Sequence, residues 1–383
     1  MTFKVGKILI TGGAGFIGFH LTQALLAAGQ SVRILDPLSP QVHGSVPVGL
    51  EWLHNGQIEF IRGSVTSEPD LRAALKEVDV VVHLAAETGT GQSMYEIKRY
   101  NDVNVGGTAL LLDILANDST RAVKRIVLAS SRSIYGEGAY VCQNCADEIR
   151  QFPDCRSAKQ LAAHQWEHVC TACGTCLTPV PTRETDPARP ASIYAATKYA
   201  QEDLVRIAST SLGIDYAILR LQNVYGEGQS LNNPYTGILS IFSTRVRRGQ
   251  VLPIFEDGLE TRDFVHVRDV ANAFLAAVLF DGAVNQTMNV GMGVKTTVTE
   301  IAGHLSDAFG ATHKLKTTSE YRLGDIRHNF ADNARLKNIL GFEPCIDLAE
   351  GMRLFAAWVG TQDVPDDRLD FANAELKARK LMG

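Results

Sequence analysis

Short, almost wholly apolar runs alternate with amphipathic stretches along the first half of the chain. The apolar runs predict strands at Lys7–Thr11, Ser31–Asp36, Ile58–Arg62, Val78–Leu84 and Val123–Ser130. The stretches between them, Ile17–Ala28, Glu68–Lys76 and Asn104–Asn117, have the apolar spacing of helices. Apolar strands that alternate with helices form a parallel sheet covered on both faces. The pattern therefore predicts a doubly wound α/β fold.

This alternation stops between residues 140 and 187, where Cys, Pro, Arg and Gln follow no apolar period. Further on, a helix is predicted at Ser192–Ser211, a strand at Tyr216–Leu221 and a helix at Val267–Phe280. Residues 226–262 are loop-rich, and a smaller mixed segment extends to about residue 360. The tail from Thr361 is polar with a short helical pattern, and no function is assigned to it.

A glycine-rich turn follows the first predicted strand. Between Gly12 and Gly18 the sequence is Gly-Gly-Ala-Gly-Phe-Ile-Gly, and a predicted helix comes next. Glycine permits a tight turn and lets backbone N–H groups approach a pyrophosphate, while the helix N-terminus adds partial positive charge. The turn therefore predicts a dinucleotide-binding site.

The carboxyl side chain of Asp36 stands at the end of the second predicted strand, at the distance expected from such a turn. A carboxylate there accepts hydrogen bonds from a free ribose 2′-OH and repels a 2′-phosphate. NAD is therefore favoured over NADP, and Arg33, which precedes the acid, does not change this preference. The alternative is that Asp36 only opens the turn at Pro37.

Tyr194 and Lys198 are one helical turn apart on the same face of a predicted helix. Oxidation of an alcohol needs a base that takes the hydroxyl proton while hydride leaves the carbon. A phenol with an ordinary pKa near 10 serves as that base at neutral pH only if a cation stabilises the phenolate. Taken alone, the pair could equally be two solvated helix residues.

Serine hydroxyls at the end of the fifth predicted strand strengthen the catalytic interpretation. Ser130 and Ser131 stand at the carboxyl edge of a parallel strand, where open α/β sheets bind their ligands. Ser131 can hydrogen-bond the reacting oxygen of a substrate beside Tyr194. The alternative is that both serines only end the strand.

The charge balance excludes two classes of partner. The 383 residues carry 42 acidic and 37 basic side chains, a formal charge of −5. Nucleic-acid and anionic-membrane binding usually need a basic surface, so neither partner is expected. No apolar run approaches the length of a membrane span, and the N-terminus has no signal-peptide pattern. We expect a soluble cytoplasmic protein.

Six of the seven cysteines lie between Cys142 and Cys176. A reducing cytoplasm disfavours a disulfide framework, which leaves metal binding as the main alternative. The pairs Cys142/Cys145 and Cys170/Cys173 have the spacing of a zinc ribbon and predict a closed, structural Zn²⁺ site. Other candidate ligands are Cys155, Cys176, His164 and His168. Unligated buried cysteines or a redox pair are the alternatives.

Taken together, the motifs resemble the extended short-chain dehydrogenase/reductase family, in its nucleotide-sugar epimerase/dehydratase branch. The resemblance covers residues 7 to about 358 apart from the cysteine-rich segment. Besides the glycine turn, Asp36, Ser131 and the Tyr194/Lys198 pair, it rests on His83-Leu-Ala-Ala86, Asn101-Asp-Val-Asn-Val-Gly-Gly107, Arg220-Leu-Gln-Asn-Val-Tyr-Gly226, Arg262-Asp-Phe-Val-His-Val-Arg-Asp269 and Asn289-Val-Gly291.

The resemblance implies roles for individual residues. Tyr194 would be the catalytic base, Lys198 its electrostatic partner and Ser131 the hydrogen-bond partner of the sugar oxygen. The implied cofactor-binding residues are Gly12, Gly15, Phe16, Ile17, Gly18, Asp36, Ser64, Val65, Leu84, Ala85, Ala86, Asn104, Ser130 and Lys198. The implied substrate-binding residues are Thr88, Arg132, Asn223, Asn233, Arg262 and Arg327.

Within that substrate set, Arg262 and Arg327 would clamp the nucleotide diphosphate, for which guanidinium geometry is suited. The alternative for Arg327 is a surface ion pair. Two departures from the family pattern affect the cofactor site. Ser64 stands where the family often has Asp, and Pro37 follows Asp36 where Asn or Asp is common.

The resemblance also implies a Rossmann-type sheet with a smaller C-terminal α/β substrate lobe and a Cys-rich insertion. The expected division is 1–139, 187–225 and 263–287 for the NAD-binding lobe, 140–186 for the insertion, 226–262 and 288–360 for the nucleotide-sugar lobe, and 361–383 for the tail. A homodimer through the helix after Asn104 and the Tyr194 helix is expected from the family.

The residues after Ser131 favour one reaction within this branch. Family dehydratases carry acidic residues there, whereas this chain has Arg132 and Ser133. Without an acid to protonate a leaving hydroxyl, elimination is disfavoured. We expect an NAD-dependent nucleotide-sugar 4-epimerase, and a finer resemblance, in the segments beginning at Asp36, Glu87 and Asn233, points to dTDP-L-rhamnose. An NAD(P)H-dependent 4-ketoreductase and a non-catalytic nucleotide-sugar sensor are the alternatives.

Overall fold

The computed structural model describes residues 5–44, 49–145, 149–231, 237–310, 314–364, 366–367 and 369–383. Its centre is a seven-stranded sheet in the order β13-β8-β5-β4-β1-β2-β3, in which every neighbouring pair is parallel. The strands are β1 (Lys7–Thr11), β2 (Ser31–Asp36), β3 (Ile58–Arg62), β4 (Val80–His83), β5 (Arg125–Ser131), β8 (Asp215–Leu221) and β13 (Gln286–Val290). The predicted doubly wound sheet is confirmed.

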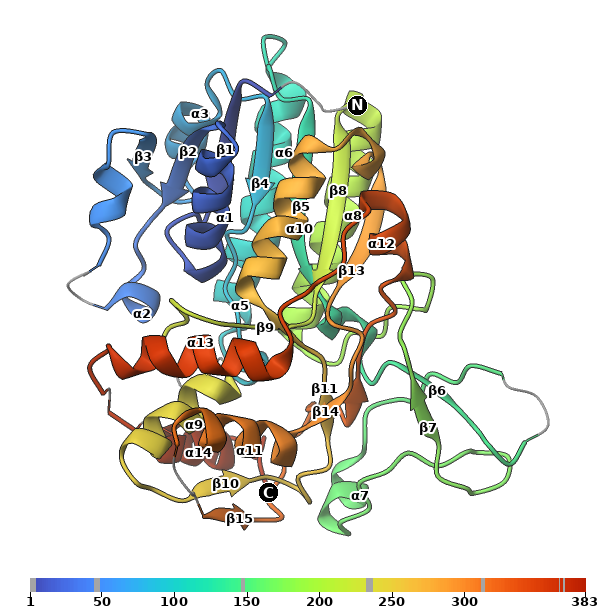
Figure 1. Cartoon of the computed structure of the whole chain (residues 1–383). Coiled ribbons are helices and arrows are strands. Elements are labelled where there is room, and N and C mark those ends of the chain that lie inside the picture. The colour runs from blue at the N-terminus through green and yellow to red at the C-terminus, as the bar shows by residue number, and fades with distance from the viewer. Residues whose placement is uncertain are drawn as a thin grey trace.

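Helices cover both faces of this sheet because alternate strand residues point to opposite sides. Ile8 and Ile10 of β1 pack with α1 (Phe16–Ala27), α10 (Val267–Leu279) and α12 (Ala334–Leu340). Leu9, between them, packs on the other face with α3 (Glu68–Leu75), α6 (Gly107–Asn117) and α8 (Ile193–Leu212). Figure 1 shows this three-layer arrangement in the upper half of the molecule.

A second core lies in the lower half of Figure 1, between α9 (Ile238–Arg247), α11 (Val298–Ala308) and α13 (Leu348–Gly360). Short strand groups surround it: β10 (Leu252–Ile254) with β15 (Leu315–Thr317); β11 (Thr261–Arg262) with β14 (Thr296–Thr297) and β16 (His328–Asn329); and β9 (Asn223–Tyr225) with β12 (Phe264–His266). We expected residues 288–360 to lie wholly in this lobe, but α12 packs on the large sheet through Leu336.

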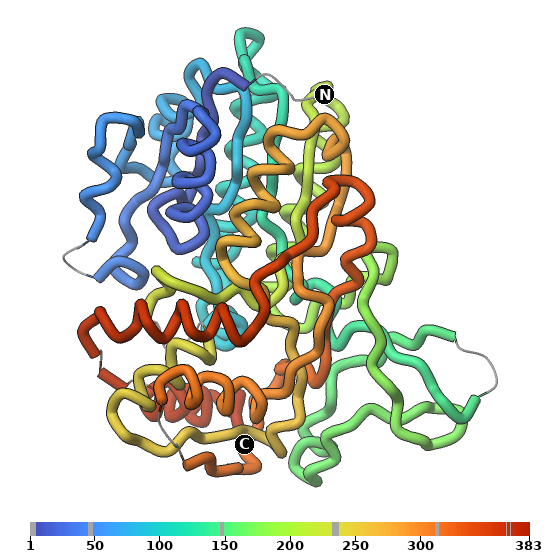
Figure 2. Tube along the Cα trace, in the orientation of Figure 1, coloured from blue at the N-terminus to red at the C-terminus, as the bar shows by residue number. Residues whose placement is uncertain are grey.

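The cysteine-rich insertion projects from the body of the molecule as a separate loop system (Figure 2). Its two ends pair as the antiparallel strands β6 (Ala139–Val141) and β7 (Thr178–Val180), and α7 (Ala158–Ala162) lies between them. Tyr140, Cys142, Cys170 and Leu177 form its small apolar cluster. So small a core leaves the segment dependent on further cross-links.

The helix predicted from Asn104 is part of a longer helical segment. It begins with α5 (Ile97–Tyr100), passes through the π-helical turn η2 (Asn101–Gly106) and continues as α6. π-helical turns inside helices frequently mark functional sites. The remaining elements are α2 (Pro40–His43), η1 (Glu51–His54), α4 (Thr90–Ser93), η3 (Arg132–Tyr135), η4 (Asp281–Ala283) and α14 (Leu369–Ala378).

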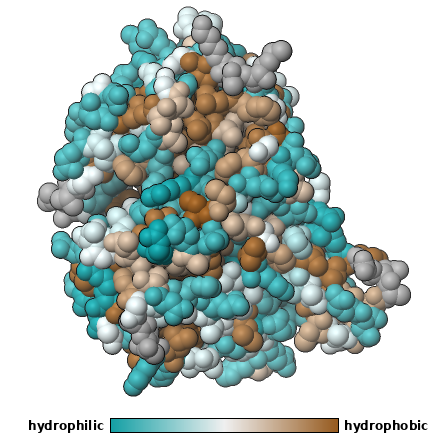
Figure 3. Space-filling model, viewed as in Figure 1, coloured by the Kyte–Doolittle hydropathy of each residue, from teal (hydrophilic) through white to brown (hydrophobic). Residues whose placement is uncertain are grey.

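Hydrophilic and hydrophobic residues are interspersed over the face drawn in Figure 3. Within the described residues, no helix is both long enough and apolar enough to cross a membrane.

Candidate active site

The glycine turn lies at the carboxyl edge of the sheet, against the segment that follows β4. Gly12 has φ +69°, and a Cβ atom there would lie 2.8 Å from the backbone of Ala85. Only glycine fits this close approach without strain. The turn and Leu84 are further joined because the Leu84 N–H donates to the Thr11 carbonyl at 3.1 Å. The structure thus brings the glycine turn and Leu84–Ala86 together, as predicted.

Helix α1 begins immediately after this turn, at Phe16, with Gly15 as its N-cap. Gly15 has no side chain that could cap the helix. The N–H groups in the first turn of a helix have no partner within the helix, so those of Phe16 and Ile17 are open to a ligand. Gly18 packs against the turn itself, since a Cβ there would lie 2.4 Å from the Gly13 carbonyl oxygen. This cradle fits a pyrophosphate on the helix N-terminus.

Asp36 ends β2 beside the cradle. Its carboxylate accepts hydrogen bonds from the Ala14 N–H at 3.1 Å and the Leu38 N–H at 2.8 Å. Burial raises the pKa of this carboxyl. Asp36 therefore stabilises both the glycine turn and the turn that begins at Pro37. It also lies at the edge of the sheet where a ribose is expected.

Two residues of the predicted cofactor set, Asn104 and Ser130, have hydrogen-bond partners within the chain. The Asn104 amide accepts from the Glu87 N–H at 2.7 Å and donates to the Glu87 carbonyl at 3.1 Å and the Thr197 hydroxyl at 3.0 Å. Ser130 donates to Glu202, which also binds Arg220. Both residues are buried supports that hold the β4 loop, α8 and β5 in register.

Two further residues of the predicted cofactor set, Ser64 and Val65, lie just after β3. Val65 belongs to the sheet core and packs on Gly107. The Ser64 N–H donates to Asp70 at 2.9 Å, and its hydroxyl is paired with that of Thr66 at 2.8 Å.

Tyr194 and Ser131 meet at the carboxyl edge of the sheet. Ser192 caps α8 by accepting from the Ala195 N–H at 3.2 Å, so Tyr194 lies in the first turn. Burial raises the pKa of Tyr194, whereas its hydrogen bond with Ser131 and the nearby Arg132 guanidinium lower that pKa. The predicted base and its serine partner are thus in contact.

Lys198 lies on the face of α8 predicted for it, but its ammonium points to the sheet. It donates to the Ala129 carbonyl and to Gln201, both at 2.9 Å. Burial lowers the pKa of Lys198 to about 7, while Glu202 opposes this shift. Arg132 is thus a cation close to Tyr194, and Lys198 lies buried one helical turn further along α8.

A cavity of about 240 Å³ is lined by Arg132 and Ser133, which follow Ser131 in the chain, and by Ser192 near the start of α8. Three arginines, Arg132, Arg262 and Arg322, belong to its lining. Arg132 donates to the Asn223 side chain at 2.7 Å, and burial, together with Arg262, lowers the pKa of Arg132 to about 9. Arg262 is held by the carbonyls of Arg327 at 3.0 Å and Ile326 at 2.6 Å. Such a group of cations is suited to a diphosphate.

Arg327 is not one of these cations, which corrects our expectation. It is fully buried and donates to Glu167 at 2.6 Å, to Asp257 at 2.7 Å and to Glu256 at 3.0 Å. Arg327 thus forms ion pairs, as in the alternative given above, but its side chain is buried and does not lie on the surface. Arg322, five residues earlier, lines the cavity with its guanidinium 4.8 Å from the centre of the Phe255 ring. Sequence reasoning missed it, although both arginines flank the same Gly324-Asp325 motif.

The loop after β4 also differs in detail from the expectation. Thr90 lines the cavity, whereas Thr88 is exposed and its carbonyl accepts from the Tyr100 hydroxyl at 2.6 Å. Asn233 lies outside the described residues.

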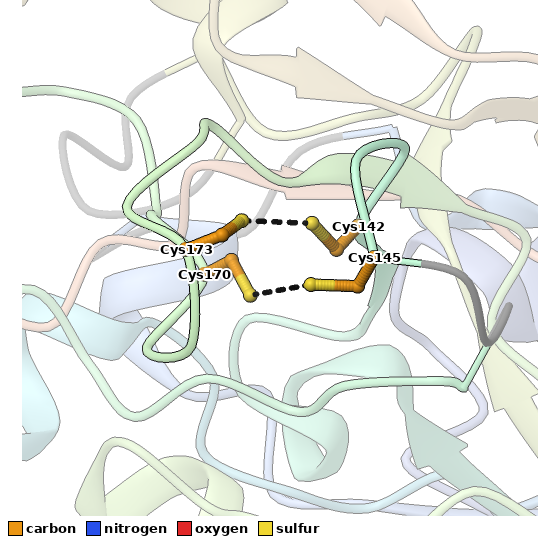
Figure 4. A group of neighbouring side chains, drawn as sticks. All are labelled: Cys142, Cys145, Cys170 and Cys173. Atoms are coloured by element: carbon orange, nitrogen blue, oxygen red, sulfur yellow. Dashed lines mark hydrogen bonds between the residues drawn. The ribbon is translucent and has the colours of Figure 1, made fainter.

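The four predicted metal ligands come together within the insertion. The Sγ atoms of Cys142 and Cys173 are 3.5 Å apart, those of Cys145 and Cys170 are 3.8 Å apart, and all four lie within 4.8 Å of one another (Figure 4). Four thiolates around Zn²⁺ at about 2.3 Å stand about 3.8 Å from each other in a tetrahedron. The donor set therefore fits zinc.

Other thiols and imidazoles of the insertion lie outside this group. Cys155 and Cys176 are exposed free thiols, and neither belongs to the four-cysteine group. His168 lies 3.2 Å from Glu137, and His164 stacks on Trp166. Hydrogen bonds from Thr175 lower the pKa of Cys173 to about 6, which favours the thiolate that a metal requires.

Comparison with known proteins places this site in a family. The profile described as "NAD dependent epimerase/dehydratase family" matches residues 8–180 and 168–291. The chain belongs to this epimerase/dehydratase family. The resemblance found in the sequence is therefore confirmed.

Members of the family match nearly the whole chain. A dTDP-L-rhamnose 4-epimerase of Burkholderia thailandensis is 38% identical over 360 residues, 93% of this chain and 95% of that protein. A putative UDP-glucose 4-epimerase of Methanocaldococcus jannaschii is 30% identical over 92% of this chain and 98% of that protein.

Solved structures of the family agree with the fold. A UDP-glucose 4-epimerase of Thermotoga maritima, solved with UDP-glucose, has a TM-score of 0.71 and 29% identity over 92% of this chain and 98% of its own. A UDP-N-acetylglucosamine 4-epimerase of Methanobrevibacter ruminantium has a TM-score of 0.74 and 27% identity over 94% of this chain and 100% of its own.

In this epimerase/dehydratase chain the insertion is tied to the cavity wall by buried charges. Arg156, from the insertion, pairs with Glu256, which lines the cavity, at 2.7 Å. Glu137 accepts from the Arg327 N–H at 2.6 Å and lies 3.2 Å from His168, two residues before Cys170. A continuous set of contacts therefore runs from the four-cysteine group to the cavity, although none of the described residues of the insertion lines that cavity.

Proposed function

We propose that this chain is an NAD-dependent nucleotide-sugar 4-epimerase whose substrate is dTDP-L-rhamnose or a closely related dTDP-6-deoxyhexose. The observation that carries the proposal is the pairing of Tyr194 with Ser131 beside Arg132, which is one of three arginines that line the cavity. The same pair is the expected machinery for removing and returning an alcohol proton. The arginines supply the charge that a nucleotide diphosphate requires.

The assignment as a nucleotide-sugar 4-epimerase is confirmed by the family match and by relatives that span almost all of the chain. The base and sugar are the finer part of the proposal. They are supported by the relative at 38% identity, a dTDP-L-rhamnose 4-epimerase.

When bound, NAD would accept hydride from C4 of the sugar and return it to the opposite face. The cradle of Gly12 and Gly15, the α1 N-terminus and Asp36 would hold it, as their geometry fits a pyrophosphate and a ribose. A Thermus thermophilus UDP-glucose 4-epimerase solved with NAD shares this fold at 27% identity and a TM-score of 0.71.

The protein side of the reaction is a reversible proton transfer at the Tyr194 oxygen. Ser131 would donate a hydrogen bond to the C4 oxygen while Tyr194 takes its proton. The Arg132 guanidinium would stabilise the resulting phenolate. After the 4-keto sugar turns over in the cavity, Tyr194 would return the proton to the C4 oxygen. The product is the alcohol of opposite configuration at C4. The neighbouring diphosphate would stay anchored on Arg262 and Arg322.

The residues beside the base argue against dehydration. The dTDP-glucose 4,6-dehydratase of Streptomyces griseus is also a relative, at 29% identity over 92% of this chain. In this chain the β5 strand end is followed by Arg132, which is bonded to Asn223, and by Ser133, which donates to Ser131 at 3.0 Å. Neither side chain is an acid that protonates a leaving hydroxyl.

The test is to incubate the purified protein with dTDP-L-rhamnose, with no added nucleotide cofactor, and to resolve the products by NMR. We expect a mixture of C4 epimers, and the variant Tyr194→Phe should lower kcat by about 10² to 10⁴-fold. Tyr199→Phe, on the same helix, is the matched control. An unchanged dTDP-L-rhamnose sample together with turnover of another nucleotide sugar contradicts the proposed substrate. In a parallel incubation with added NADPH, its stoichiometric consumption would favour the ketoreductase alternative.

We also propose that Cys142, Cys145, Cys170 and Cys173 bind one structural Zn²⁺, supported by their sulfur separations. A cytoplasmic location, where the thiols stay reduced, is proposed with it. The homodimer expected through α6 and α8 remains a proposal, which the mass in solution by light scattering will test.

A further inference from the structure

The C-terminal segment pairs with a loop that forms part of the cavity. The N–H of Tyr321 donates to the Gly383 carbonyl at 2.9 Å, and that of Gly383 donates back at 3.0 Å. The N–H of Leu323 donates to the Leu381 carbonyl at 2.9 Å, and Arg322 donates to the Asn373 side chain at 2.9 Å. Tyr321 and Arg322 both line the cavity. The tail is therefore joined to the substrate site.

Helix α14 of this tail also contacts α9, and Figure 1 shows both helices in the lower half of the molecule. Arg245 of α9 pairs with Asp367 at 2.9 Å and with Asp370 at 3.2 Å, on either side of Leu369. These ion pairs hold the start of α14 against α9.

At its other end α14 contacts the loop that follows β4. A Cβ on Gly91 would lie 3.6 Å from Leu376, and Arg379 stacks 4.2 Å from the centre of the Tyr95 ring. In the same loop, Ser93 accepts from the Tyr194 N–H at 3.1 Å. Helix α14 thus bridges three segments that shape the substrate site.

Leu369 brings the tail into the cavity itself. It is 4% exposed and lines the cavity together with Ile238, Ile241 and Phe242 of α9. These four side chains have no hydrogen-bonding group. A sugar hydroxyl against them would lose its hydrogen bonds to water without replacement, whereas a methyl group would be favourably buried.

We propose that α14 is part of the nucleotide-sugar site and that Leu369 is a specificity-determining residue that packs against a methyl group of the substrate. The proposal rests on the proposed function and deepens it. A dTDP-6-deoxyhexose has two such groups, C6 of the sugar and the 5-methyl of thymine, and both have the same contact chemistry.

The test compares Leu369→Ala with Phe371→Ala, a matched control on the same helix whose side chain is 64% exposed. Dissociation constants are measured by calorimetry for dTDP-L-rhamnose, UDP-L-rhamnose and dTDP. Removing an apolar contact of this size should raise the Kd of dTDP-L-rhamnose by about 10-fold or more. Phe371→Ala should leave it unchanged, and NAD affinity should be equal in both variants and the wild type.

The three ligands distinguish the two methyl groups. A loss shared by dTDP and dTDP-L-rhamnose, but not by UDP-L-rhamnose, assigns the contact to thymine. A loss shared by both rhamnosides, but not by dTDP, assigns it to C6 of the sugar. Unchanged affinity of folded Leu369→Ala for all three overturns the proposal.

Failure of the proposed substrate is a separate result. If the wild-type protein converts another nucleotide sugar and not dTDP-L-rhamnose, the substrate assignment falls. Leu369→Ala is then measured with that sugar and with its nucleoside diphosphate. An unchanged Kd for both would overturn the role of α14 as well.

Discussion

Arg156 and Glu256 form a buried, bidentate ion pair that joins the cysteine-rich insertion to the wall of the substrate cavity. Their atoms are 2.7 Å apart for Nη1–Oε2 and 2.8 Å for Nη2–Oε1. Both side chains are almost fully buried. The pair therefore fixes the position of the insertion relative to Glu256, a residue that lines the cavity.

Removing one partner of this pair should therefore affect both stability and binding. Arg156→Met removes one guanidinium partner of buried Glu256 and leaves Arg327, which Glu256 shares with other acids. We therefore expect a loss of about 1–3 kcal/mol in the free energy of unfolding. Urea unfolding measures it, and KM for the nucleotide sugar should rise. Arg183→Met, which breaks an exposed ion pair with Asp332, is the control. Equal stability of the two variants would contradict the prediction.

The four cysteines should hold about one equivalent of zinc, measured by elemental analysis of the purified protein. A strong chelator, or Cys170→Ser, should lower Tm, because metal binding to such a site is coupled to folding. KM should rise more than kcat falls, since the insertion contacts the cavity wall and not Tyr194. Cys176→Ser, at an exposed thiol outside the group, should retain full zinc. Zinc content below about half an equivalent would count against the site.

Arg322 and Arg327 should respond differently to the same substitution. Arg322→Met removes a cavity cation, so KM for the nucleotide sugar should rise by about 10-fold or more, with Tm little changed. Arg327→Met removes the shared partner of three carboxylates, of which Glu256 is buried and Glu167 and Asp257 are partly exposed, and should mainly lower Tm. Steady-state kinetics and thermal unfolding of both variants decide this assignment, and the reverse pattern would restore Arg327 as the clamp.

The stability of the NAD-free protein should depend on pH through Lys198. Its pKa is about 7 in the folded chain because of burial, against about 10.4 in the unfolded chain. Between these values the unfolded state binds more protons, so the free energy of unfolding rises with pH. Relative to Lys198→Met, the wild type should gain about 2 kcal/mol between pH 7 and 9. Parallel pH profiles of the two proteins would refute this.

The sheet and the reacting pair could be predicted from local signals. Apolar runs marked strands β1 to β5 of the large sheet, though not β6 and β7 of the insertion, and the Gly12–Gly18 turn identified the cradle. Tyr194 and Ser131 could be joined because the carboxyl ends of parallel strands and the following helix starts share one edge. These features depend on short stretches of sequence.

The missed features depend on contacts between distant segments. Arg322 and Arg327 flank one motif, and which of them faces the cavity is decided by Glu167 of the insertion and by Asp257. Lys198 has the predicted spacing, but its direction is set by the Ala129 carbonyl. The role of α14 depends on partners more than 100 residues away, such as Arg245. Sequence periodicity does not report such pairings.

The insertion begins and ends on two paired strands, β6 and β7, so its entry and exit points are neighbours. Chain geometry alone would let a short turn replace it. Such a deletion would remove Arg156 and Glu167 from this group of charges, leaving Arg327 paired with Glu256, Asp257 and Glu260 of the body. A relative that lacks the insertion should therefore have other side chains at the positions of Glu256 and Arg327. The insertion and these two residues are thus expected to be gained or lost together.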